Sequence, residues 1–209
     1  MVDVGSLLVM AAAFFVVAVA PGPATLGCAS VAMAHGRRAG LGFGLGLGAA
    51  LLFWGVLAAL GLGAVIATSA QVMLWLKLLG ALYLFWLAWK AGRAAWHGEI
   101  STAAEVRSGR WIWRGVLLNL SNPKAIFAWL ATLSLGLGPE ATGLSVALAT
   151  LLCGIIGFAV YLPWVLGFSH PKVMAGYRKV HRWVDGVVAT LFAVAGLGLI
   201  RSALSRAPA

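Results

Sequence analysis

The stretch FFVVAVAPGPATLGCASVAMA, Phe14 to Ala34, is apolar enough to lie within a membrane, yet Pro21, Gly22 and Pro23 stand near its middle. A proline inside a helix costs about 3 kcal/mol or more, and here two prolines flank a glycine. The stretch therefore predicts a helix that is interrupted at a depth where its backbone finds no water. The rest of the sequence indicates what the interruption is for.

The amino-acid composition indicates whether the chain lies in water or in a membrane. Of its 209 residues, 62% are hydrophobic and 10% are charged, against roughly 25% charged residues in a soluble domain. The alternating ten-residue segments of a membrane β-barrel are absent, so we expect an all-α membrane protein forming one transmembrane domain over residues 1–209. Apolar stretches long enough to cross a bilayer occur six times. The predicted spans are Val4–Met33, Ala39–Ile66, Val72–Trp96, Trp111–Leu135, Thr142–Phe168 and Val184–Ile200.

Basic residues concentrate in the first, third and fifth connections between these spans. The positive-inside rule places those connections in the cytoplasm and both chain termini outside. The net charge of +10 is then directed at anionic lipid, and no nucleic-acid partner is expected. The residues concerned are Arg37, Arg38, Lys90, Arg93, Arg107, Arg110, Arg114, Lys172, Arg178, Lys179 and Arg182.

A second interruption matches the first. The fourth predicted span contains NLSNPKA, Asn119 to Ala125, and its Pro123 follows Pro23 by 100 residues. Each half of the chain, about 1–100 and about 101–209, then contains three spans. Because three is odd, the second half enters the membrane in the opposite sense, which predicts a 3+3 inverted repeat with interrupted first and fourth helices.

Capping preferences indicate how the broken ends point. Asn122 is a favoured N-cap and Pro123 a favoured first helical residue; Gly22 and Pro23 follow the same pattern less strongly. Two half-helix N-termini then converge at mid-membrane with Lys124 beside one of them, which predicts a site for the carboxylate of a small solute. The alternative is that the prolines only kink the helices and that Lys124 pairs with backbone carbonyls at the break.

The stretches Pro21–Pro23, HGRRAGLGFGLGLG, LKLLGALYLFWLAWKAGR and NLSNPKA occur in an order that resembles the lysine and threonine exporter (LysE/RhtB) family. The resemblance implies a six-helix secondary transporter of the bacterial inner membrane that exports amino acids. It also implies coupling to protons and assembly as a homodimer. The predicted substrate-binding residues are Pro21, Gly22, Pro23, Thr25, Asn119, Asn122, Pro123 and Lys124.

Four further side chains in or near the spans have two interpretations each. Asp185 carries the coupling proton, or it pairs with Arg182 near a helix N-terminus. Lys77 lines the cavity, or its long side chain reaches the outer membrane surface. Tyr83 and Tyr161 line the cavity, or they are buried between helices. No acidic residue is expected at the centre of a span, so we expect neutral amino acids to be preferred over lysine and arginine.

A glycine stripe and the scarcity of reactive groups limit the other functions. Gly40, Gly44 and Gly48 fall one helical turn apart and predict close helix packing. The four histidines are expected in cytoplasmic connections, and no set of nucleophile, acid and base occurs in the spans, so neither an enzyme nor a cofactor is expected. Metal ligands are too few for a bound metal. A passive channel and an exporter of metal ions or other small solutes remain the alternatives.

Overall fold

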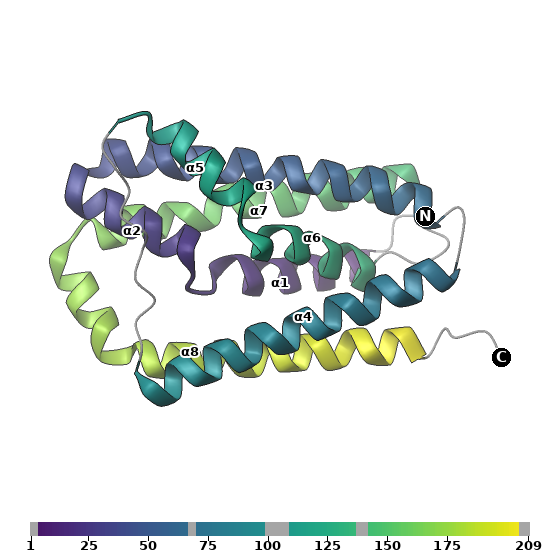
Figure 1. Ribbon diagram of the computed structural model, residues 1–209. Coiled ribbons are helices and arrows are strands. Elements are labelled where there is room, and N and C mark those ends of the chain that lie inside the picture. Colours follow the sequence, from purple (N-terminus) through teal and green to yellow (C-terminus); the bar gives the residue numbers. More distant parts are fainter. Residues whose placement is uncertain (1–3, 67–69, 99–108, 137–141, 205–209) are drawn as a thin grey trace.

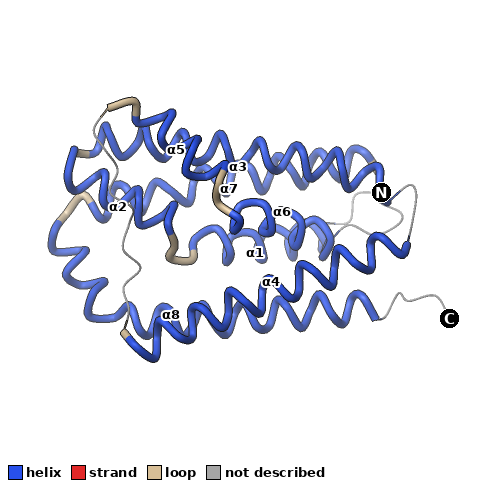
Figure 2. The backbone as a smooth tube through the Cα atoms, in the orientation of Figure 1, coloured by secondary structure: helices blue, strands red, loops and turns tan. Residues whose placement is uncertain are grey.

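The computed structural model describes residues 4–66, 70–98, 109–136 and 142–204, and the regular structure in these ranges is entirely helical (Figure 2). The all-α prediction is therefore confirmed for the described residues. The helices are α1 (Val4–Val19), α2 (Pro23–His35), α3 (Arg37–Ile66), α4 (Ala70–His97), α5 (Trp111–Leu120), α6 (Pro123–Gly136), α7 (Gly143–Phe168) and α8 (Pro171–Leu204).

The chain passes back and forth along the long axis of one bundle (Figure 1). α1 and α2 run in one direction, α3 returns, α4 runs forward, α5 and α6 return together, α7 runs forward and α8 returns. α3, α5 and α7 lie together on one side, and α4 and α8 pack along each other on the opposite side. α1 and α6 lie between these two layers, so the interrupted helices occupy the centre of the bundle.

Both predicted interruptions are present. α1 ends at Val19 and α2 begins at Pro23, with the two axes bent by 54°. α5 ends at Leu120 and α6 begins at Pro123. Proline suits the first position of a helix, where its missing N–H has no partner to lose and its φ angle is already helical. A proline therefore begins the second half of each interrupted helix.

The predicted glycine stripe allows close packing of α3. Gly40, Gly44 and Gly48 face α2 and α7, and a side-chain carbon on Gly48 would overlap the ring of Phe158. Close packing along this stripe is thus confirmed.

A second set of glycines, which the sequence reasoning missed, brings the backbones of α3 and α5 into contact. A side-chain carbon on Gly46 would overlap the carbonyl of Ile112, and one on Gly115 would overlap the carbonyl of Phe43. α3 and α5 are consequently packed at backbone distance.

The last helix begins earlier than the predicted span that it contains. Lys172–Arg182 was expected to be a cytoplasmic connection before Val184, but α8 begins at Pro171 and continues to Leu204. Hydropathy detects only the apolar part of a helix, whereas Pro171 at its first position and the absence of a breaker allow the basic segment to continue the same helix. Side chains near residue 180 therefore belong to the bundle and not to a loop.

The surface fits a membrane environment. By length and apolar composition, α3 (Arg37–Gly61), α7 and α8 are each able to cross a membrane, and the bent α1–α2 pair counts as a fourth span when taken together. Exposed large apolar side chains occur along all the long helices, as in Leu60, Leu79, Leu151 and Leu197. The protein is a multi-pass helical membrane protein; the six crossings of the inverted repeat remain a prediction.

Candidate functional site

Lys124 joins the two breaks directly. Its Nζ donates a hydrogen bond to the carbonyl oxygen of Ala20 at 2.7 Å. Ala20 follows the last residue of α1, where carbonyl groups lose their helical partners because the helix ends. The predicted alternative, pairing of Lys124 with a backbone carbonyl, is therefore observed. An ammonium group has three N–H donors, and the bond to Ala20 uses one of them. No other described residue accepts a hydrogen bond from Lys124 Nζ.

Each half-helix start is stabilised locally. In the first break the Gly22 N–H donates to Thr25 Oγ1 at 3.0 Å. In the second, the Lys124 backbone N–H donates to Asn122 Oδ1 at 3.1 Å, which makes Asn122 the N-cap as predicted. Capping satisfies part of each helix terminus and leaves other N–H groups exposed at the break.

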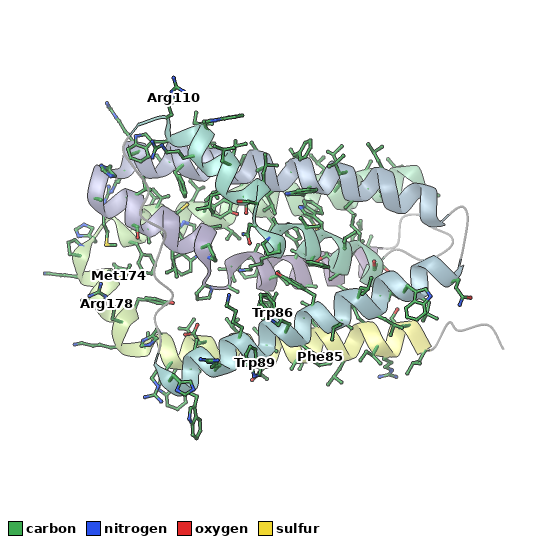
Figure 3. All side chains as sticks on the ribbon, viewed as in Figure 1. Phe85, Trp86, Trp89, Arg110, Met174 and Arg178 are labelled. Atoms are coloured by element: carbon green, nitrogen blue, oxygen red, sulfur yellow. The ribbon has the colours of Figure 1, made fainter. Side chains whose placement is uncertain are left out.

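A central cavity of about 250 Å³ lies where the two breaks face the α4–α8 pair. This volume is below the roughly 300–1,000 Å³ of pockets for drug-sized ligands and suits a smaller solute. Figure 3 labels Trp86, whose side chain lines this cavity, and Phe85, which packs against Gly196 of α8. The residues that define the central cavity are Pro21, Gly22, Pro23, Asn122, Pro123 and Lys124 from the breaks, Tyr83, Trp86 and Lys90 from α4, and Tyr177, Asp185 and Phe192 from α8.

Asp185 is the acidic residue of this cavity. It is only 8% exposed. Arg182, its predicted partner, instead donates to the carbonyl oxygens of Ala95 and Trp96 at 2.8 Å each, so the predicted pairing is wrong. The carbonyls at the end of α4 attract this guanidinium because they carry the negative end of the helix dipole. Within the described ranges, no side chain or backbone group donates a hydrogen bond to Asp185.

His181 also belongs to the bundle, contrary to the expectation that every histidine lies in a connection. It is buried in α8, one turn before Asp185. Its Nδ1 lies 2.8 Å from the carbonyl oxygen of Arg178, and its Nε2 lies 3.2 Å from that of Gly98. Both ring nitrogens are therefore directed at backbone oxygens that accept hydrogen bonds, one on its own helix and one at the end of α4.

Tyr83 contributes a hydroxyl group to the same region. Its ring stacks on Phe127 with the centroids 4.1 Å apart. Its hydroxyl is buried and has no hydrogen-bond partner in the protein. A buried polar group without a partner costs free energy, so this hydroxyl is an unsatisfied donor and acceptor beside the cavity.

A second and much smaller cavity, about 20 Å³, lies on the other side of the breaks. It has room for about one water molecule. Asn119 on its wall donates to the carbonyl of Leu47 at 2.8 Å and to the hydroxyl of Tyr161 at 3.3 Å, and Asn122 donates to Asn119 Oδ1 at 3.0 Å. These side chains are engaged with one another and with the backbone, which fixes the second break against α3 and α7.

The predicted site residues therefore do not all line the same cavity. Pro21, Gly22, Pro23, Asn122, Pro123 and Lys124 line the central cavity, together with Tyr83 and Asp185. Thr25, Asn119 and Tyr161 line only the small cavity.

Lys77 lines neither cavity and does not extend to the surface. It is 2% exposed and donates to Ser202 Oγ at 2.9 Å, so its ammonium is held inside the bundle against α8.

Sequence reasoning missed the aromatic and basic lining residues Trp86, Lys90, Tyr177 and Phe192, as well as the apolar ones Leu87, Ala91, Ala94 and Val188. Lys90 was assigned to the cytoplasmic surface with the other basic residues. The helical spacing of Tyr83, Trp86 and Lys90 on α4 was a signal, because residues three and four apart share one face. It could not be used without knowing which face of α4 meets the breaks. In the described residues, no three His, Cys, Asp or Glu side chains gather as metal ligands.

The fold and cavity define a multi-pass helical membrane protein in which two interrupted helices meet at a solute-sized space lined by both charged and apolar side chains. Comparison with known proteins agrees with this class. The sequence profile of the LysE type translocators matches residues 15–203, and the chain belongs to this family. The resemblance noted in the sequence is thereby confirmed.

Individual relatives cover almost the whole chain. The threonine efflux protein of Escherichia coli is 29% identical over 201 residues, which is 93% of this chain and 97% of that protein. The threonine efflux protein of Salmonella typhi is 29% identical over 187 residues, 87% of this chain and 91% of that protein. An uncharacterized membrane protein of Pseudomonas aeruginosa is 30% identical over 200 residues, 88% and 90% of the two chains. No solved structure matches.

Proposed function

We propose that this protein is a secondary active exporter of amino acids or closely related small solutes. The observation that carries the proposal is the central cavity, at which the starts of α2 and α6 and the ammonium of Lys124 lie together. Helix N-termini and a cation favour a bound anion, and here the anion is the carboxylate of the substrate. Membership of the translocator family and the two relatives named as threonine efflux proteins support this class of function.

The proposal includes six crossings arranged as a 3+3 inverted repeat. Its first half is α1–α2, α3 and α4, and its second half is α5–α6, α7 and α8. A two-fold axis in the membrane plane brings equivalent elements of such halves together. The contacts between α4 and α8, between α3 and α7, and between the two breaks support this arrangement.

The proposed orientation puts both termini on the external face of the bacterial inner membrane. Arg110 and Arg178, labelled in Figure 3, lie at the same end of the bundle, and Arg37 begins α3 at that end (Figure 1), which supports a cytoplasmic assignment for it. Reporter fusions at Gly98 and after Leu204 test the orientation. Gly98 is expected to report cytoplasm and the C-terminus the outside; the opposite pair of results would reverse the topology.

Neutral amino acids are the proposed substrates, and protons the proposed coupling ion. The reason for neutral substrates changes with the structure, because Asp185 does line the central cavity. Lys90 and Lys124 line it too, so cationic groups outnumber carboxylates there and repel a lysine or arginine side chain. Assembly as a homodimer belongs to the same proposal and rests on the family resemblance.

Transport by purified protein in liposomes tests the function. A panel of radiolabelled amino acids is counterflowed, and then accumulation is measured with an imposed pH gradient. We expect exchange of neutral amino acids and accumulation against their gradient. Downhill movement without accumulation would identify a passive channel, and movement of divalent metal ions without amino acids would identify the other alternative.

A further inference from the structure

We propose that Asp185 is the receptor for the positively charged amino group of the substrate and that Lys124 holds the carboxylate of the same molecule across the central cavity. The inference rests on the proposed function and assigns Asp185 a binding role in place of the proton-carrying role considered from the sequence. The protein would then recognise a zwitterion by two opposite charges, one from each side of the cavity.

Asp185 has hydrogen-bonding capacity that no described residue meets. A carboxylate that is 8% exposed needs donors, because removing it from water without them is costly. The basic side chains nearby on α8 are directed elsewhere: Arg182 donates to the end of α4, and both nitrogens of His181 face carbonyl oxygens. A substrate ammonium has three N–H donors and a positive charge, so it can donate the hydrogen bonds that the Asp185 carboxylate does not receive from the described residues.

The two charges come from different helices of the cavity wall. Asp185 lies on α8, and Lys124 lies at the start of α6, yet both line the central cavity of about 250 Å³. That space holds about eight water molecules at about 30 Å³ each, enough for a small amino acid but not for a large solute. Lys124 has donors left after its bond to Ala20, so a carboxylate can bind there without breaking the contact between the two breaks.

The rest of the cavity wall includes polar and aromatic side chains of α4. Tyr83 lines the central cavity, and its buried hydroxyl has no partner in the protein. Trp86, against which Lys90 stacks at 5.1 Å, forms an aromatic surface beside it. A cavity lined by two opposite charges, a polar group and an aromatic surface matches a small neutral amino acid.

Asp185→Asn tests the assignment, because it removes the charge and preserves the shape. Counterflow is measured at equal pH on both sides, where proton coupling plays no part. The probes are L-threonine and 2,3-dihydroxybutanoate, which replaces the amino group of threonine with a hydroxyl. The unmodified protein should favour threonine. In Asp185→Asn the half-saturation concentration for threonine should rise roughly tenfold or more, as for loss of a charged hydrogen bond, while that for the hydroxy acid changes little.

Asp185→Glu is the matched variant, since it keeps the charge and should keep the preference for threonine. If either variant fails to transport, ligand-induced thermal stabilisation by threonine measures binding on its own. Unchanged threonine half-saturation in Asp185→Asn, with accumulation driven by a pH gradient abolished, would show that Asp185 carries protons and would overturn the assignment. Failure of the unmodified protein to exchange any amino acid would overturn the proposed function itself.

Discussion

The α3–α5–α7 layer and the α4–α8 pair are held in different ways. In the layer, Gly46 and Gly115 bring backbones into contact, and Asn119 hydrogen-bonds across to α3 and α7. The α4–α8 pair has its most extensive contacts within itself and much weaker ones with α3 and α7. The space left on its inner side is the central cavity. One side of the molecule is therefore a fixed body, and the other is a wall that encloses the substrate space.

The two breaks lie at the boundary between these regions, and they differ from each other as well. The first is made by Pro21, Gly22 and Pro23, which supply no side-chain donor. Its Ala20 carbonyl has no helical partner and accepts hydrogen bonds from side chains instead. The second supplies polar side chains, Asn122 as a cap and Lys124 as the cation that reaches Ala20. One break provides space and an acceptor, and the other provides the charge.

The largest effect is expected on folding, from a substitution at the contact between α3 and α5. In Gly115→Ala the new carbon would overlap the carbonyl of Phe43, so the loss of stability should exceed the roughly 1–3 kcal/mol of a typical overpacked core. Size-exclusion chromatography and thermal melting should show little folded protein. Gly61→Ala, with open space around the added carbon, is the control and should fold normally. Normal folding of Gly115→Ala would show that α3 and α5 are not packed at backbone distance.

The second-largest effect is expected on transport, from a substitution in the first break. Gly22→Leu should displace Lys124 and fill the central cavity, so counterflow should fall to background while the protein still folds. Gly22→Ala should retain transport, because its added carbon would lie 3.6 Å from Lys124 Nζ, an ordinary contact, and the extended backbone there suits any residue. Equal activity of the two variants would show that the first break does not border the substrate space.

The smallest effect is expected on stability alone, from a substitution in the α4–α8 pair. Ser202→Ala removes one partner from the buried ammonium of Lys77 and should cost about 1.5–3 kcal/mol of stability, the usual range for a hydrogen bond to a charged group. The substrate half-saturation concentration should not change, since Lys77 is not in the wall of either cavity. A lower melting temperature with unchanged counterflow supports the separation of the two regions; altered substrate affinity contradicts it.

Sequence alone predicted the features that depend on local chemistry. Proline at the start of a half-helix and asparagine as a cap act within a few residues, so both breaks and the position of Asn122 could be located before the structure. Lys124 stood out because a cation deep in an apolar span is rare. These are properties of short segments and need no knowledge of neighbouring helices.

The remaining site residues depend on which helix faces meet. Asp185 and Lys90 were placed near the cytoplasmic surface because hydropathy measures depth along a chain and not the direction of a side chain. The pairing of α4 with α8 brings both into the central cavity. Lys77 is the opposite case. Its position near the end of a predicted span suggested that its side chain reaches the surface, but packing against Ser202 buries it. Tertiary packing decided each of these cases.

Comparison of an amino acid with its methyl ester tests the central claim most directly, because the ester lacks only the carboxylate charge. Counterflow by the unmodified protein should strongly favour L-threonine over L-threonine methyl ester. Lys124→Ala should weaken recognition of the acid by about 1.5–3 kcal/mol, as expected for a charged hydrogen bond, and should narrow the gap between acid and ester. If the unmodified protein carries the ester as well as the acid, or if Lys124→Ala transports threonine normally, the two breaks do not form the carboxylate site.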